Sequence, residues 1–168
     1  AMGGSPGFEA SINPNEVSAK FAVRASGNAE ALYAPAFVED ATVRDSLLSQ
    51  QAVAQTLDLA RQSTWAVVGI GTPADDSILV RANCLSREQA GELRAAGAVG
   101  EIIGNYCDIQ GQPVDSPVPN RLIGLSLEEL QGIPVVVAAA AESGKAAAIL
   151  GALRSGVVRV LVTECRNA

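Results

Sequence analysis

Lys145 stands where an apolar stretch gives way to an alanine-rich one in this 168-residue chain, and residues 134–156 are PVVVAAAAESGKAAAILGALRSG. Glu142, Ser143 and Gly144 form a polar break, so Lys145 is expected in the first turn of the helix that follows. A cation there opposes the helix dipole, at a cost of about 0.3–1 kcal/mol when it is exposed. An anionic ligand would reverse that penalty, and free backbone N–H groups, a hydroxyl and an ammonium could together cradle a phosphate.

The SGK stretch is a weak motif by itself, because it lacks the first glycine and the spacing of a Walker A loop. A solvated lysine after a glycine turn explains the same letters, and both interpretations stay open. Lys20 and Lys145 are the only lysines. A reversible Schiff base between Lys145 and an open-chain sugar aldehyde is therefore a further hypothesis.

A second polar break lies in GIGTPADDSILVR, residues 69–81. Gly71 has no side chain and could let a ligand approach the backbone closely. Asp75 and Asp76 are interpreted as turn or helix-start residues rather than as paired catalytic carboxylates. Arg81 has no obvious helical partner, so a surface position and a ligand contact both stay open.

A third polar break lies in GAVGEIIGNYCDIQG, residues 97–111. Glu101 alternates with apolar residues inside an expected strand, and Asp108 ends that strand before a glycine turn. Carboxylates accept several hydrogen bonds and therefore suit the hydroxyl groups of a sugar. An aspartate before Ile-Gln-Gly is also ordinary turn chemistry, so the role of Asp108 stays open.

The elements that must position these residues alternate between strand and helix length along the whole chain. Strands are expected at residues 31–37, 65–71, 98–108, 121–126, 133–140 and 158–164. The alternation and the Val/Ile runs predict an α/β fold, a three-layer α/β/α Rossmann-like sandwich with a mainly parallel sheet buried on both faces. Ligands bind such sheets beyond the carboxyl ends of the strands, where the three polar breaks lie.

Helix starts carry capping chemistry at two places. Ser86 with Gln89, and Ser126 with Glu129, each match the capping box. The segment 43–63 has a helical pattern that is interrupted in its middle. These helices are expected to cover the sheet.

Composition limits the classes of function. Hydrophobic residues make up 48% and charged residues 18%, which is typical of one globular α/β domain. The net charge of −6, with no basic stripe, argues against nucleic-acid binding by this chain alone. Three cysteines and no histidine disfavour zinc sites, disulfide frameworks and Cys/His catalysis. No apolar run reaches membrane-spanning length and the start does not resemble a signal peptide, so a cytoplasmic location is expected.

Taken in order, these segments resemble the C-terminal effector-binding domain of the SorC family of bacterial sugar-responsive transcriptional regulators. The resemblance rests on LYAPAFVEDATVRDSLL at 32–48, on residues 65–111 and on residues 121–164. It implies a fold similar to the sugar-phosphate isomerase and CoA-transferase group. Such a domain binds phosphorylated sugars at the strand ends without turning them over.

The residues that match the family's ligand site are Lys145, Glu101, Asp108, Arg81, Gly71, Gly3 and Gly4. The resemblance assigns the lysine to the phosphate or polar groups of the ligand, the two carboxylates to sugar hydroxyls, and the arginine to the ligand-facing surface. Gly3 and Gly4 match a loop that closes over the ligand, and Gly71 matches the floor of the ligand pocket. The usual Ala-Gly-Gly before the lysine is AAAES here, which could place Glu142 near the anion. An unphosphorylated polyol or a different anion therefore stays open.

The resemblance thus implies that residues 1–168 are the effector-binding and oligomerisation domain of a sugar-responsive regulator, lacking its first strand and its N-terminal helix-turn-helix domain. Its expected partners are a phosphorylated sugar or related effector, DNA only through the missing domain, no membrane, and further copies in a homodimer or homotetramer. No cofactor, metal or catalytic residue is expected. The alternative is a sugar-phosphate isomerase or deaminase on the same fold, with Glu101 or Asp108 as base and Lys145 holding phosphate.

Overall fold

The computed structural model describes residues 1–7 and 13–165. The helices are α1 (Pro14–Arg24), α2 (Ala41–Leu48), α3 (Gln51–Arg61), α4 (Ile78–Arg81), α5 (Arg87–Ala95), α6 (Leu127–Gln131) and α7 (Ala146–Arg154), with a 3-10 turn, η1, at Val118–Arg121. The strands are β1 (Trp65–Gly69), β2 (Gly100–Ile102), β3 (Asn105–Cys107), β4 (Val135–Ala140) and β5 (Val160–Thr163). None of the helices in these residues is long and apolar enough to cross a membrane.

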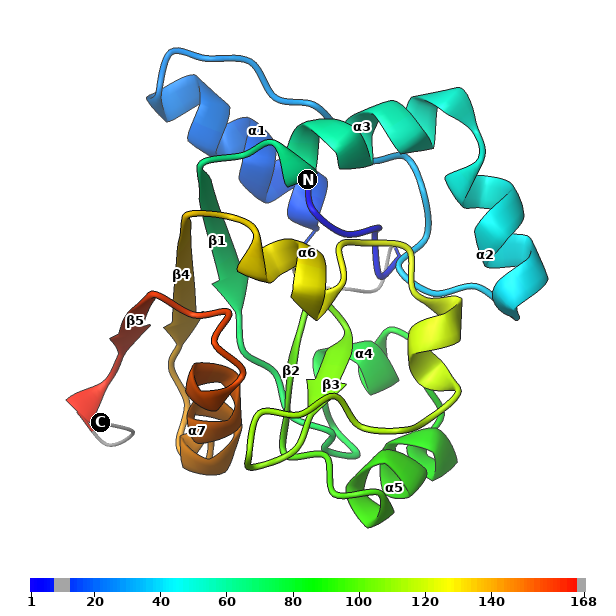
Figure 1. The fold of residues 1–168 in the computed structure, drawn as a ribbon, viewed down its shortest axis with the longest axis vertical. Coiled ribbons are helices and arrows are strands. Elements are labelled where there is room, and N and C mark those ends of the chain that lie inside the picture. Colours follow the sequence, from blue (N-terminus) through cyan, green and yellow to red (C-terminus); the bar gives the residue numbers. More distant parts are fainter. Residues whose placement is uncertain (8–12, 166–168) are drawn as a thin grey trace.

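Three of the strands form a parallel sheet in the order β1-β4-β5 (Figure 1). Trp65 lies opposite Val135, and Val137 lies opposite Val160. Because the strands are parallel, their carboxyl ends meet at one edge of the sheet, from which the chain enters α7 after β4. The predicted α/β class with a mainly parallel sheet is confirmed.

The segment predicted as a single strand at residues 98–108 is an antiparallel hairpin instead. β2 and β3 pair with Gly100 opposite Cys107. Ile103 and Gly104 form the turn and have positive φ angles of 51° and 76°. Two-residue hairpin turns favour such angles, but a β-branched residue is an unusual occupant of the first position. The turn was missed because Ile103 extends the apolar pattern of the strand.

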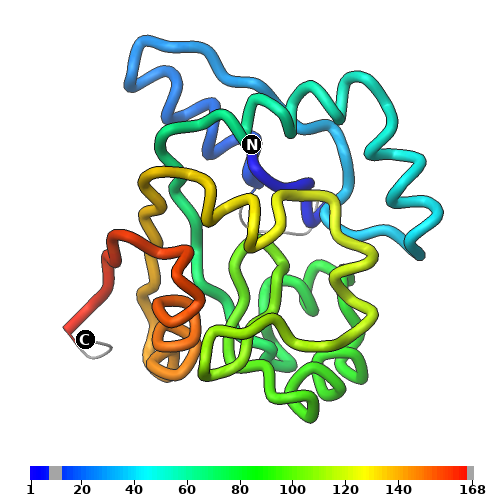
Figure 2. The backbone as a smooth tube through the Cα atoms, viewed as in Figure 1, coloured from blue at the N-terminus to red at the C-terminus, as the bar shows by residue number. Residues whose placement is uncertain are grey.

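The segments predicted as strands at 31–37 and 121–126 make only isolated bridges. Gly3 bridges to Gly124, Ser5 to Pro35 and Phe37 to Leu122. Figure 2 shows the dark-blue N-terminal segment beside the yellow segment that contains residue 124. Pro35 has no N–H group to donate, which limits the ladder that this stretch can form.

The predicted helix starts and the predicted interruption are confirmed. Both capping boxes are present, at Ser86 with Gln89 and at Ser126 with Glu129. The helical segment 43–63 divides into α2 and α3. The capping residues therefore fix where α5 and α6 begin.

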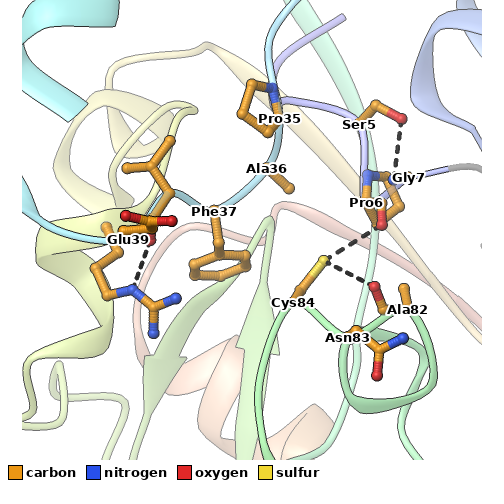
Figure 3. A pocket seen from close by; sticks show the side chains of 12 residues that line it. Ser5, Pro6, Gly7, Pro35, Ala36, Phe37, Glu39, Ala82, Asn83 and Cys84 are labelled. Atoms are coloured by element: carbon orange, nitrogen blue, oxygen red, sulfur yellow. Dashed lines mark hydrogen bonds between the residues drawn. The ribbon is translucent and has the colours of Figure 1, made fainter. Parts of the chain in front are cut away.

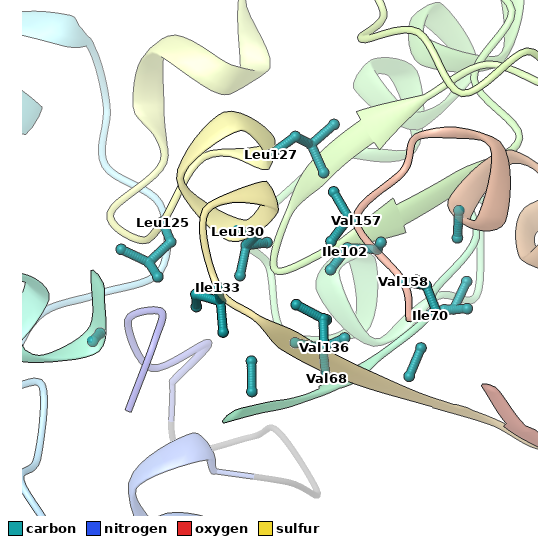
Figure 4. Packing of buried hydrophobic residues seen from close by; sticks show 14 of the residues in the cluster. Val68, Ile70, Ile102, Leu125, Leu127, Leu130, Ile133, Val136, Val157 and Val158 are labelled. Atoms are coloured by element: carbon teal, nitrogen blue, oxygen red, sulfur yellow. The ribbon is translucent and has the colours of Figure 1, made fainter. Parts of the chain in front are cut away.

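The main core lies between one face of the parallel sheet and the helices α3, α6 and α7. Figure 4 shows Val68 and Val136 of the sheet packed near Leu130 and Ile133. At Gly100 a side chain would lie 2.9 Å from the Cα atom of Ala148 in α7. The absence of a side chain at this position lets α7 pack directly against the hairpin.

Candidate functional site

Glu101 links the hairpin to the end of β1. Its backbone exchanges two hydrogen bonds of 3.0 Å with Gly71. Its Oε2 atom accepts a hydrogen bond of 2.6 Å from the backbone N–H of Gly104. Its Oε1 atom lies so close to Gly71 that a methyl group there would overlap it. The structure therefore brings together Glu101 and Gly71, two of the predicted site residues.

The Glu101 carboxylate lies in an environment that resists its charge. Burial raises the pKa of Glu101, while the Gly104 N–H group and the positive charge of Lys145 act in the opposite direction. A carboxylate has room for about four hydrogen bonds, and Gly104 supplies one. The group can therefore accept further donors, such as hydroxyl groups.

Lys145 is the N-cap residue of α7, one position before the first turn in which it was predicted. Its side chain is 19% exposed, and its Nζ atom lies 3.0 Å from Oε2 of Glu142. The ammonium is therefore mostly covered and paired, which disagrees with the interpretation as a solvated lysine. Glu142 does lie beside the cation, at the position where the sequence departs from the family pattern.

The glycine pair near the N-terminus lies against the same hairpin turn. Gly3 and Gly4 are buried. A side chain on Gly3 would lie 2.6 Å from the Cγ2 atom of Ile103. The N–H group of Gly4 donates a hydrogen bond of 2.9 Å to the carbonyl of Ile123. The glycine pair is thus packed next to the turn whose N–H group holds Glu101.

Asp108 lies at the opposite end of the hairpin from that turn. Its Oδ1 atom accepts hydrogen bonds from the backbone N–H groups of Gln110, at 2.9 Å, and of Gln112, at 2.8 Å. These bonds make it a turn residue, which agrees with the second interpretation of its role. A contact between Asp108 and a ligand stays a prediction.

The segment around α4 contains the residues Asp75, Asp76 and Arg81, which were considered from the sequence. Asp75 and Asp76 lie in the turn before the helix, and Asp75 pairs with Arg94 at 2.8 Å. Their interpretation as turn residues is confirmed. Arg81 ends α4 with an exposed side chain that makes no hydrogen bond or ion pair within the described ranges. Its role as a ligand contact stays a prediction.

Tyr106 is a polar residue of the site that sequence reasoning missed. It pairs with Glu101 across the hairpin, so the two side chains lie on the same face. The residue is 2% exposed, and its hydroxyl has no hydrogen-bond partner within the described part of the chain. Burial raises the pKa of Tyr106, and the charges of Glu101 and Cys84 add to the increase. Only knowledge of the hairpin register could have shown this pairing.

A hollow of about 330 Å³ opens beside the segment that follows the glycine pair (Figure 3). Its walls come from three loops and from the last residue of η1, and consist of Ser5, Pro6, Gly7, Pro35, Ala36, Phe37, Val38, Glu39, Ala82, Asn83, Cys84 and Arg121. The Cys84 thiol donates to the carbonyl of Pro6 at 3.4 Å, and burial raises its pKa. The guanidinium of Arg121 donates to the carbonyl of Val38 at 2.6 Å. These loop residues follow no pattern that identifies them in the sequence.

The polar side chains on and near the hairpin, which do not line the hollow, suit a ligand rich in hydroxyl groups. The Glu101 carboxylate accepts hydrogen bonds, and the Lys145 ammonium and Tyr106 hydroxyl can donate them. The ammonium can also meet an anionic group. In the described ranges, no three His, Cys, Asp or Glu side chains gather as metal ligands.

Comparison with known proteins agrees with this chemistry. A family model described as "Putative sugar-binding domain" matches residues 1–168. The chain is 31% identical over 149 residues to the transcriptional regulator YjhU of Escherichia coli, covering 89% of this chain and 45% of the relative. It is 30% identical over 156 residues to the erythritol catabolism regulatory protein EryD of Brucella abortus, covering 93% and 49%. The chain thus spans about half the length of these curated relatives.

Solved structures show the same fold. A structure described as a "Putative Sugar-Binding Domain of Transcriptional Repressor" from Vibrio fischeri is similar with a TM-score of 0.88 and 36% identity. The match covers 99% of this chain and 65% of that one. The full-length sorbitol operon regulator SorC from Klebsiella pneumoniae has a TM-score of 0.86 at 23% identity, which shows the fold alone, over 96% and 53% of the two chains. These neighbours are consistent with the predicted Rossmann-like fold.

Proposed function

Because this chain belongs to the sugar-binding domain family of SorC-type bacterial transcriptional regulators, we propose that it binds a sugar or sugar phosphate as the effector of such a regulator. Relatives at 30% identity or more are named as regulators, so the role is regulatory rather than enzymatic. The alternative of an isomerase or deaminase loses its support. DNA binding would belong to a separate domain, in keeping with the net charge of −6.

The effector site that we propose is centred on Glu101 and Lys145. One observation carries it: the Glu101 carboxylate, which has spare acceptor capacity, lies on β2, and β2 packs directly against α7, the helix that begins at the mostly covered Lys145. The Gly71 backbone lies against the carboxylate, and the Gly3–Gly4 pair lies next to the turn that holds it. Arg81 and Asp108 stay ligand contacts by resemblance alone.

The ion pair between Lys145 and Glu142 bears on the class of effector. The Glu142 side chain is 76% exposed, so it can move outward at little cost. We propose that the phosphate of a phosphorylated sugar or polyol replaces this carboxylate as the partner of the lysine. The description of the relative EryD as a regulator of erythritol catabolism supports a polyol-derived ligand.

Residues 1–168 are, in this proposal, the larger part of an effector domain whose first strand and helix-turn-helix domain lie outside the sequence. Effector binding would shift the population of subunit arrangements in a homodimer or homotetramer, and the DNA-binding domain would respond to that shift. The protein would act in the cytoplasm, where its operator DNA is found.

A thermal-shift screen of sugars, polyols and their phosphates tests the proposal. A ligand at one hundred times its Kd stabilises a protein by about 2.7 kcal/mol, which raises the Tm by several degrees. We expect Lys145→Met and Glu101→Gln to abolish the shift. Lys20→Met is the matched control, because the other lysine of the chain is exposed on α1 and should leave the shift unchanged. If no compound of these classes shifts the Tm of the wild-type protein, it is not a sugar sensor.

A further inference from the structure

The turn that holds Glu101 has a shape that its own sequence does not favour. Ile103 and Gly104, the two turn residues, have φ angles of 51° and 76°. Positive φ angles at both positions are typical of Asn-Gly turns. A β-branched residue in this region is an outlier, and such strain persists only where the surrounding structure enforces it. Contacts from outside the turn must therefore keep Ile103 in this conformation.

The side chain of Asn105 makes such contacts. Asn105 is the first residue after the turn and is 8% exposed. Its Nδ2 atom donates hydrogen bonds to the carbonyl of Ile102 at 3.0 Å and, at a longer 3.4 Å, to that of Ile103. It also donates to the carbonyl of Leu125 at 2.9 Å. One buried amide thus fixes two consecutive carbonyl groups of the turn and joins them to a distant segment of the chain.

The distant segment leads in turn to the N-terminal glycines. The N–H group of Leu125 donates to the carbonyl of Met2 at 3.0 Å, and Gly124 forms an isolated bridge with Gly3. The side chain of Ile103 lies against both glycines, since a methyl group on Gly3 or Gly124 would be 2.6 Å or 3.3 Å from its Cγ2 atom. The packing of Ile103 therefore fixes where the turn lies, while the amide of the asparagine fixes how its peptide groups are oriented.

We infer that Asn105 is a positioning residue of the proposed effector site. The carbonyl of Ile103 and the N–H group of Gly104 belong to one planar trans peptide and point in opposite directions. The asparagine amide binds this peptide on its carbonyl side. The N–H group is thereby directed to the other side, where it donates to Oε2 of Glu101 at 2.6 Å. Asn105 thus acts through the turn on the orientation of the carboxylate that is proposed to meet the effector.

This role rests on the effector site proposed at Glu101, and it differs from a merely structural one. An asparagine that served only to satisfy buried carbonyl groups would contribute to stability and would leave the orientation of Glu101 unchanged. A positioning asparagine sets the direction of the carboxylate, so its loss changes what the carboxylate can bind. Stability and binding therefore respond differently in the two cases.

Removal of the amide gives the first test. Asn105→Leu removes all three hydrogen bonds at a similar side-chain volume. The matched control is Ser155→Ala, because Ser155 is also buried and its Oγ atom donates to a backbone carbonyl, that of Ala152, at 2.7 Å, at the end of α7 opposite Lys145. The probe is erythritol phosphate, after the polyol named for the relative EryD. We expect Asn105→Leu to weaken its binding about ten-fold in isothermal titration, whereas Ser155→Ala should lower the Tm without changing the affinity.

A second substitution should restore binding without restoring stability. Ile103→Asn creates an Asn-Gly turn, which adopts the observed backbone shape by its own preference. In the Asn105→Leu background, this change should recover most of the affinity for erythritol phosphate. The Tm should stay low, because the hydrogen bond to Leu125 is still missing. If Ile103→Asn restores no affinity, the turn is not the route by which Asn105 acts.

A measurement without ligand separates this inference from the proposed function. The bond from the Gly104 N–H group lowers the pKa of Glu101, so Asn105→Leu should move the NMR titration of the Glu101 carboxyl carbon to higher pH. Lys145, the other group that lowers this pKa, is the same in every variant.

Ile103→Asn in the Asn105→Leu background should reverse the shift of the titration, and Ser155→Ala should leave it at the wild-type position. An unchanged titration in Asn105→Leu would overturn the inference whether or not erythritol phosphate binds. The expected shifts in a protein that binds none of the screened compounds would refute the proposed function and leave the positioning role intact. If Asn105→Leu fails to fold, Asn105→Ser keeps one donor and should give a smaller shift in the same direction.

Discussion

Glu101 and Tyr106 face each other across the β2–β3 hairpin, one with a satisfied carboxylate oxygen and the other with a buried hydroxyl that lacks a partner among the described residues. A buried polar group without a hydrogen bond costs about 1–3 kcal/mol. The pairing therefore places a residue with an unused donor opposite Glu101 on the hairpin, in the part of the protein where a hydroxyl-rich effector is proposed to bind.

Removal of this hydroxyl should separate stability from binding. We expect Tyr106→Phe to leave the free energy of unfolding of the free protein unchanged or to raise it by up to about 1 kcal/mol, because the burial cost disappears. The same variant should weaken the thermal stabilisation by the effector. Thermal unfolding with and without ligand measures both quantities. A clear loss of stability in the free protein would show that the hydroxyl has a partner.

The raised pKa of Glu101 predicts a pH dependence of stability. Because the folded protein holds this proton more tightly than the unfolded chain, stability from this group is fully present below its ordinary pKa of 4.5 and is lost as the pH rises through the folded value. Glu101→Gln should remove that loss. We therefore expect the variant to gain stability relative to wild type as the pH rises from about 4 toward neutrality. Urea unfolding at a series of pH values measures the difference, and a constant difference would contradict the prediction.

Loss of the Glu142 charge should favour anionic effectors. Since the carboxylate pairs with Lys145 at 3.0 Å, a phosphate must compete with it. We expect Glu142→Gln to tighten the binding of a sugar phosphate several-fold, in line with about 1 kcal/mol for an exposed ion pair. Binding of the unphosphorylated sugar should not change. Isothermal titration measures both affinities, with Glu128→Gln at an exposed position of α6 as the control. An equal change for both ligands would show that no phosphate meets the lysine.

Two glycines should respond differently to the same methyl group. At Gly71 the methyl would meet the flexible end of Glu101, so Gly71→Ala should displace the carboxylate and weaken effector binding with a stability loss of only about 1 kcal/mol. At Gly4 it would meet the backbone of Pro35, which cannot move aside, so Gly4→Ala should cost about 2–3 kcal/mol. Urea unfolding and ligand titration separate the two outcomes. The reverse order of stability losses would be inconsistent with the packing described.

The sheet and the helix starts were predictable because local rules govern them. The Val-rich segments of β1, β4 and β5 and the capping boxes at Ser86 and Ser126 carry their own signals. The hairpin was not predictable, because Ile103 extends an apolar pattern through a turn that only tertiary pairing explains. A strand was predicted at residues 31–37 because the composition there resembles a strand, but only isolated bridges form.

Gly71 and Lys145 follow strands of one parallel sheet, and the rule that such strands end at one edge predicts their common edge. The rule does not explain the contact of Glu101 with Gly71, because Glu101 lies on the antiparallel β2–β3 hairpin and meets Gly71 through an isolated antiparallel bridge. The sequence indicated the partner of Lys145 only indirectly, through AAAES where the family pattern has Ala-Gly-Gly before the lysine. Tyr106 and the loop-lined hollow could not be found, since their positions depend on the hairpin register and on contacts between distant loops. Residue types thus indicated the chemistry, and the fold decided which groups meet.

The close contact between Gly100 and Ala148 ties the hairpin to the helix that Lys145 caps. With backbone against methyl group and no long side chain between them, neither element can slide without carrying the other. A compound bound by Glu101 at one end and by Lys145 at the other would thus contact two elements that move together. Any motion that it transmits to the rest of the regulator should be a displacement of that whole block.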